Sequence, residues 1–281
     1  MNRKSKNKFF RTACFGAIIC SVIVLVVLLY NVISIGWPYL SVKFLNSFPS
    51  REAASAGIKS ALFGSVWILV SITIISVPLG VAAAIYLEEY SPKNKWTRFV
   101  EINISNLAGV PSIVYGILGL VIFVRFFHLD RSVLAGSFTM SLLILPVIII
   151  TSREAIKAVP KTIRLGAYAL GATKWQTIRH HVLPIATPGI MTGVILSISR
   201  AIGETAPLIM MGAFTYVAFV PATVWDKFTT LPIQIYNWTS RPQAEFHEIA
   251  SAGIIVLLVV LLSMNAAAII IRKRANKKYD W

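Results

Sequence analysis

The sequence predicts an all-α membrane protein with six transmembrane helices. Of its 281 residues, 56% are hydrophobic and 14% are charged, whereas soluble domains carry about a quarter charged residues. The mean hydropathy is +0.73. Five stretches between charged residues are apolar over the length of about 20 residues that a bilayer requires, and a sixth is interrupted by Arg200 and Glu204.

We expect a short tail over residues 1–11 and a single transmembrane domain over residues 12–281. The first apolar run is too long for a secretory signal and lacks an Ala-x-Ala cleavage site, so we expect it to be retained. Cys14 and Cys20 lie in this run, where we expect small buried residues and no disulfide framework. The expected spans are about 13–36, 61–87, 102–124, 133–152, 185–212 and 249–271.

The distribution of basic residues predicts the orientation of these spans. The connections alternate between two faces, and the face that holds both chain ends carries 19 Lys and Arg against seven on the other. Because basic loops stay on the cytoplasmic side, we expect both termini in the cytoplasm. The net charge of +16 is therefore an orientation signal and gives no basis for a nucleic-acid interface.

The outer connection over about 214–248 is long and aromatic. It could hold a short interfacial helix or a docking surface, or its aromatic residues could form an interfacial belt. Both interpretations stay open from the sequence. The aromatic residues concerned are Tyr216, Phe219, Trp225, Phe228, Tyr236 and Trp238.

The connection between spans four and five contains start and stop signals for two short helices. Pro160 suits the first turn of a helix, and Gly171 suits the left-handed position that ends one. Thr173 and Gln176 have the spacing of a capping box, which begins a second helix. We expect Pro184 to break that second helix before span five.

This connection, over about 153–184, carries more apolar surface than a linker needs. It could be an amphipathic hairpin packed on its own bundle, or a surface for a cytoplasmic partner. The residues alone leave both interpretations open. The apolar residues are Tyr168, Leu170, Trp175, Ile178 and Val182.

A charged pair interrupts span five. Arg200 and Glu204 are four residues apart and so face the same side of a helix. The pair could be a structural ion pair, or Arg200 could bind an anion, because its planar donors match phosphate or carboxylate oxygens. Gly203 would let a ligand approach the backbone, and we expect Pro207 to interrupt the helix one turn later.

Span three combines loosening residues with hydroxyl groups. Gly109 and Pro111 weaken the helix, and Ser112 and Tyr115 supply hydroxyls at membrane depth. This pattern fits a segment that lines a transport path. It also fits a kinked helix whose small residues allow close packing.

The hairpin sequence resembles a cytoplasmic loop of ABC-importer permeases. The resemblance rests on the spacing from Ala167 and Gly171 to Leu183 and Pro184, although Leu165 stands where that family often has Glu. In that family the loop forms coupling helices that sit in a groove of the ATPase subunit. The resemblance implies ATPase-coupling roles for Ala167, Leu170, Gly171, Ala172, Trp175, Leu183 and Pro184.

Two further stretches resemble the signatures of permeases from phosphate-specific ABC importers. They are residues 107–116 and 199–208, and Thr205 followed by Ala and Pro points to the PstA type. The resemblance implies the type I ABC importer permease fold and a need for Arg200 in transport. It also implies a heterodimer with a homologous sister permease, two cytoplasmic ATPase subunits, and an extracytoplasmic phosphate-binding protein.

We therefore expect a permease subunit for inorganic phosphate in the cytoplasmic membrane, without a catalytic or metal site. The chain lacks a phosphate-binding loop for ATP, so we expect no cofactor on it, with ATP and Mg²⁺ used by the ATPase. The adjacent His180 and His181 are expected on the surface. Substrate-path candidates are Arg200, Glu204, Thr205, Ser112 and Tyr115, and hinge or packing candidates are Gly109, Pro111, Gly203 and Pro207.

Three alternatives remain at this point. The chain could be a permease for another oxyanion such as sulfate or molybdate. It could be an ATP-independent anion transporter or channel, which would leave the hairpin unexplained. A membrane-embedded enzyme would need several convergent acidic, His or Ser groups, and one Arg–Glu pair falls short of that.

Overall fold

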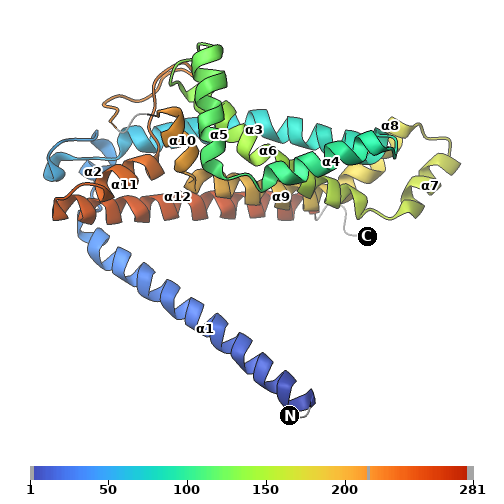
Figure 1. The fold of residues 1–281 in the computed structure, drawn as a ribbon, viewed down its shortest axis with the longest axis horizontal. Helices are drawn as coiled ribbons and strands as arrows, with labels where there is room; N and C mark the ends of the chain where they lie inside the picture. The colour runs from blue at the N-terminus through green and yellow to red at the C-terminus, as the bar shows by residue number, and fades with distance from the viewer. Residues whose placement is uncertain (1–2, 214–215, 277–281) are drawn as a thin grey trace.

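The computed structural model describes residues 3–213 and 216–276, which are mostly helical (Figure 1). The α-helices are α1 (Arg3–Gly36), α2 (Val42–Asn46), α3 (Lys59–Ile85), α4 (Lys95–Ala108), α5 (Ser112–Gly119), α6 (Val133–Lys157), α7 (Lys161–Ala169), α8 (Lys174–Thr177), α9 (Leu183–Gly203), α10 (Ala206–Met211), α11 (Leu231–Thr239) and α12 (Ala244–Asn276). Wider π-helical turns form η3 (Tyr86–Tyr90), η4 (Leu120–Phe126) and η5 (Ile178–Val182), and short 3₁₀ turns form η1 (Trp37–Tyr39) and η2 (Ala53–Ser55).

Five helical segments are long and apolar enough to cross a membrane, and a bent pair of helices would make the sixth span. The all-α, six-span prediction is confirmed in this form. The helices extend beyond the apolar stretches that predicted them, and α1 already begins at Arg3 within the expected tail. The five segments are Phe9–Tyr39, Lys59–Tyr90, Val133–Lys157, Lys174–Gly203 and Ala244–Lys273. Residues 1–2 and 277–281 of the two predicted chain ends lie outside the described residues.

The third span, expected over residues 102–124 as a helix weakened at Gly109 and Pro111, is divided into two helices at these residues. Helix α4 begins earlier, at Lys95, and the chain bends by 101° between α4 and the α5–η4 segment. Gly109 closes α4, and Pro111 starts α5. The bend falls here because proline lacks an N–H and disfavours the helical conformation of the residue before it.

The centre of the bundle is held together by close approaches between small and bulky residues. A Cβ atom on Gly80 would lie 2.6 Å from Ile148, and one on Gly193 would lie 2.1 Å from Thr151. Transmembrane helices associate through such tight packing, since lipid tails are as apolar as the side chains. These contacts pack α3 and α9 against α6, which places α6 in the middle of the bundle.

One end of the bundle carries the hairpin formed by α7 and α8, and the other carries α2 and α11 (Figure 1). We call these the hairpin end and the loop end. At the loop end, the aromatic connection contains the short helix α11, which contacts α12 and α3. Phe228 and Trp238 are fully buried there, whereas the other aromatic residues named above stay exposed: Tyr216, Phe219, Trp225 and Tyr236.

Helix α1 leans away from the other helices over most of its length (Figure 1). It is anchored near its end, where Gly36 packs against the backbone of Ala252 and Tyr39 donates a hydrogen bond to Glu248. Cys14 and Cys20 are therefore exposed in this chain, and the expectation that they are buried is wrong. The apolar run places them on a helix, but no other helix among the described residues covers it at their level.

Candidate functional site

The charged pair of span five lies at the end of α9. Arg200 Nε and Glu204 Oε1 are 3.3 Å apart, as the four-residue spacing predicts. The Arg200 side chain is 58% exposed and the Glu204 side chain 20% exposed. A single, partly exposed carboxylate therefore faces a guanidinium group that keeps most of its donors open.

The pair lies halfway along the bundle. Helices α9 and α6 run antiparallel, since Gly189 packs on Ala155 and Gly193 on Thr151. The same register places Arg200 at the level of Ile144, near the middle of α6. An arginine at this depth in a bilayer is expensive unless it faces protein or water.

The chain leaves the helix immediately after the charged pair. Helix α9 ends at Gly203, and Glu204 has extended backbone angles. The interruption therefore precedes the one expected at Pro207, which instead lies in the first turn of α10, where a proline is well tolerated. A Cβ atom on Gly203 would meet no atom within 4 Å, so the surface beside Arg200 is open in this chain.

The two signature segments meet in space. A Cβ atom on Gly116 of α5 would lie 2.6 Å from the Pro207 carbonyl oxygen of α10. Ser112 is half-buried at the start of α5, but Tyr115 is buried, and its hydroxyl donates to the Leu107 carbonyl at 2.8 Å. This hydroxyl fastens the bend between α4 and α5, so Tyr115 positions the site without presenting a free hydroxyl to it.

Two exposed asparagines on α4 were not among the predicted site residues. Ile104 and Ser105 of α4 share a small cavity with Ile149 and Ile150 of α6, which sets the level of α4 against α6. Asn106 then lies near the level of Ile148, about 6 Å along the bundle from the level of Arg200. Asn103 and Asn106 are both exposed. The sequence feature that could have identified these asparagines is an amide side chain inside an apolar stretch.

The hairpin has the predicted local geometry. Gly171 has a left-handed φ of +81°, and Thr173 and Gln176 form both hydrogen bonds of a capping box. Leu170 is 90% exposed and Trp175 is half-exposed. The hairpin therefore does not use these side chains to pack on its own bundle, while Ala167 is buried and Ala172 is half-buried.

Pro184 does not break the helix that begins at Lys174. The π-helical turn η5 joins α8 to α9, and one helical segment runs from Lys174 to Gly203. A wider turn accommodates the proline ring, which would clash with the preceding turn of a regular helix. Leu183 and Pro184 are half-buried at this junction. The expected break is therefore wrong, and the hairpin is continuous with the helix that carries Arg200.

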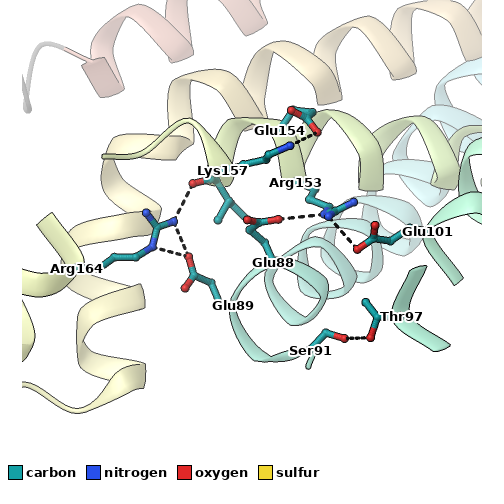
Figure 2. A network of polar contacts seen from close by, with 10 residues as sticks. Glu88, Glu89, Ser91, Thr97, Glu101, Arg153, Glu154, Lys157 and Arg164 are labelled. Atoms are coloured by element: carbon teal, nitrogen blue, oxygen red, sulfur yellow. Dashed lines mark hydrogen bonds and ion pairs between the residues drawn. The ribbon is translucent and has the colours of Figure 1, made fainter. Parts of the chain in front are cut away.

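A network of ion pairs joins four elements at the hairpin end (Figure 2). Arg153 of α6 pairs with Glu88 of η3 at 3.1 Å and with Glu101 of α4 at 2.8 Å. Arg164 of α7 pairs with Glu89 of η3 at 2.7 Å. The sequence analysis used these residues as orientation signals and did not predict that they bind one another.

Arg164 also holds the end of α6. Its guanidinium donates to the carbonyls of Val159 at 2.7 Å and Ile156 at 3.0 Å. The neighbouring Lys174 ammonium lies 4.7 Å from the centre of the Tyr90 ring, a cation–π contact. The hairpin is thus fastened to η3 through both of its helices.

No group of three or more His, Cys, Asp or Glu side chains in the described ranges is arranged to hold a metal ion. His180 and His181 are both exposed.

The comparisons with known proteins identify the family and the fold of the chain. The family described as "Binding-protein-dependent transport system inner membrane component" matches residues 76–277. The chain belongs to this family. It is similar to the probable ABC transporter permease protein YqgI of Bacillus subtilis (strain 168), with 34% identity over 95% of each chain. It is also similar to the phosphate transport system permease protein PstA 1 of Mycobacterium tuberculosis (strain CDC 1551 / Oshkosh), with 32% identity over 99% of this chain and 92% of the relative.

The fold is shared with a solved permease-containing structure. A bacterial alginate ABC transporter, in complex with an alginate pentasaccharide-bound periplasmic protein, matches with a TM-score of 0.69 and 15% identity over 94% of this chain and 93% of that chain. The predicted type I importer permease fold and the resemblance to PstA-type permeases are confirmed. The chain is a multi-pass membrane permease subunit and not an enzyme.

Proposed function

We propose that this permease moves inorganic phosphate inward across the cytoplasmic membrane. The continuous helix Lys174–Gly203 carries the proposal, because it joins the exposed hairpin directly to the mid-bundle Arg200. Six of the permeases similar to this chain, including PstA 1, are named as phosphate transport system permeases. Arg200 supplies the planar set of donors that a phosphate group requires.

The proposed assembly pairs this chain with a homologous sister permease, two cytoplasmic ATPase subunits and an external phosphate-binding protein. Both termini and the hairpin lie in the cytoplasm, in line with the excess of Lys and Arg on that side. ATP and Mg²⁺ act at the partner ATPase, and this chain holds neither. The exposed Leu170 and Trp175 provide the apolar contacts to the ATPase, and Gly171 keeps the two hairpin helices at their fixed angle.

ATP-driven closure of the ATPase dimer moves the hairpin. The displacement passes along the helix Lys174–Gly203, because a helix without a break transmits an axial movement to its far end. The pair of Arg164 with Glu89 and the contact of Lys174 with Tyr90 carry η3 along with the hairpin. The α9–α10 turn and the α5 segment packed against it then move together, which switches access to Arg200 between the two sides.

Phosphate released from the binding protein meets Arg200 in the outward-facing state. In the empty state, Glu204 neutralises Arg200 through one contact of 3.3 Å. An incoming phosphate supplies several acceptor oxygens and competes with this carboxylate. Asn106 lies near the same level and offers an amide donor to the path.

ATP-dependent uptake of labelled phosphate by vesicles that hold the reconstituted complex tests this proposal. We expect the uptake to require ATP. Excess sulfate or molybdate should leave the uptake nearly unchanged. Preferential inhibition by sulfate or molybdate would assign the permease to another oxyanion. Uptake by this chain without a co-purifying ATPase would assign it to the channels or secondary transporters.

A further inference from the structure

A cationic cavity lies at the hairpin end, outside the proposed transport path. Its volume is about 740 Å³, and it opens between the connection from η3 to α4, the first turns of α4, and the end of α6. Five basic and two acidic side chains line it, which leaves a surplus of three positive charges. The charged residues are Lys93, Lys95, Arg98, Arg153 and Lys157, with Glu88 and Glu101.

The two acidic residues do not neutralise the surplus. Both Glu88 and Glu101 bind Arg153, which occupies that arginine within the ion-pair network. Lys93, Lys95 and Arg98 are exposed, and their side chains have no hydrogen-bond or ion-pair partner among the described residues. Three free cations thus share one cavity, a setting that attracts a phosphate-containing anion.

An aromatic pair beside the cavity identifies the source of that anion. Trp96 and Phe99 alternate with Lys95 and Arg98 along α4, and their rings stack with centroids 5.5 Å apart. Trp96 is 70% exposed and Phe99 is more than half exposed. Exposed aromatic residues next to lysine and arginine at the end of a membrane helix are typical of the headgroup level of a bilayer.

We propose that this cavity binds the headgroup of an acidic phospholipid such as phosphatidylglycerol. Lys93, Lys95 and Arg98 contact the phosphate diester, while Trp96 and Phe99 lie against the upper part of the acyl chains. Free inorganic phosphate shares the anionic chemistry but has no apolar part for these two rings to contact. None of these features depends on which solute the permease transports, so the lipid site is independent of the proposed function.

Native mass spectrometry of the purified full-length permease, titrated with phosphatidylglycerol or phosphatidylcholine, tests the proposal. We expect the Lys93→Gln/Lys95→Gln/Arg98→Gln variant to lose phosphatidylglycerol affinity on the order of 100-fold, given the attraction that each basic residue contributes near an anionic membrane surface. Phosphatidylcholine binding should be unchanged. The matched control Lys161→Gln/Arg179→Gln/Lys273→Gln removes three exposed charges near the same end but outside the cavity, and should bind as wild type.

Two further arms separate the lipid from its competitors. Trp96→Ala should weaken phosphatidylglycerol binding, whereas Trp225→Ala, which removes an exposed tryptophan at the loop end, should not. Excess inorganic phosphate should leave the bound lipid in place. Equal loss in the cavity variant and the charge control, displacement by inorganic phosphate, or no preference for phosphatidylglycerol would each overturn the proposal. Circular dichroism of every variant establishes that a loss of binding does not reflect a loss of fold.

Discussion

Two of the arginine–glutamate sites among the described residues differ in their surroundings. At mid-bundle, Arg200 has one contact of 3.3 Å to Glu204, four residues away on the same stretch of chain, and most of its side chain is exposed. At the hairpin end, Arg164 is 16% exposed and holds Glu89, 8% exposed, together with two backbone carbonyls. The first arginine keeps free donors and the second has few left.

This difference separates an arginine that can exchange its partner from one that cannot. A partly exposed pair with one contact contributes roughly 0–1 kcal/mol to stability, so an anion can displace its carboxylate at little cost. Removing one partner of a buried, multiply bonded pair leaves an uncompensated charge, which is strongly unfavourable. Burial and the number of acceptors, and not the residue types, therefore distinguish the two sites. Our proposal that Arg200 serves transport and Arg164 serves coupling rests on this difference.

Arg200→Ala should have the largest effect on transport. We expect phosphate uptake by the reconstituted complex to fall to background, because no other cation in the described part of the helix Lys174–Gly203 lies at this depth. The melting temperature and the amount of assembled complex should stay close to wild type, since the pair is partly exposed. Uptake at the wild-type rate would show that Arg200 is not part of the substrate path.

Arg164→Met should have the largest effect on stability. The substitution leaves the Glu89 carboxylate and two carbonyls without their donor, so the free energy of unfolding should fall by about 3 kcal/mol. Thermal unfolding of the purified permease measures this change, and Lys161→Met, at an exposed position on the same helix, is the control. The double variant Arg164→Met/Glu89→Leu should recover part of the loss. A melting temperature unchanged by Arg164→Met would refute the distinction between the two sites.

Gly171→Val should uncouple the hairpin without creating a clash. A Cβ atom at Gly171 meets no atom within 4 Å, so the effect comes from the left-handed φ of +81°. That conformation disfavours a side chain by about 1–2 kcal/mol. We expect ATP hydrolysis that no longer depends on phosphate transport, measured as the ratio of phosphate imported to ATP consumed. Gly171→Asn, which tolerates this conformation better, should retain more coupling, and equal ratios in both variants and wild type would argue against the role.

Asp226 should show the smallest effect, and one that depends on pH. The backbone N–H groups of Thr223 and Ala222 donate to its carboxylate at 2.8 Å, which lowers its pKa from the ordinary value. A lowered carboxyl pKa contributes stability above the unfolded-state pKa of about 3.9, and this contribution disappears as the pH falls through the folded-state pKa. Asp226→Asn should therefore melt slightly below wild type at pH 7, with the difference vanishing in strong acid. A difference that persists there would mean that the carboxylate charge is not responsible.

The sequence predicted the parts of the molecule that local rules determine. The left-handed Gly171, the capping box at Thr173 and the four-residue pairing of Arg200 with Glu204 depend on neighbours within one or two helical turns. The apolar stretches likewise predicted the spans, because the bilayer sets their length.

Features that depend on distant residues could not be predicted in the same way. The pairing of Arg164 with Glu89 joins residues 75 positions apart, and nothing in either local sequence specifies it. The size of the bend at Gly109 depends on the packing of α5 against α10. The helix continues through Pro184 because a π-helical turn precedes the proline. The Tyr115 side chain points inward because its hydroxyl donates a hydrogen bond to the Leu107 carbonyl on the other side of that bend.

The central claim is that Glu204 and phosphate compete for Arg200. Equilibrium binding of labelled phosphate to the complex purified without its phosphate-binding protein, comparing wild type with Glu204→Gln, tests it most directly. We expect tighter phosphate binding in Glu204→Gln, because the amide no longer neutralises the guanidinium, and no binding in Arg200→Ala. Equal affinity in wild type and Glu204→Gln, or wild-type affinity in Arg200→Ala, would contradict it.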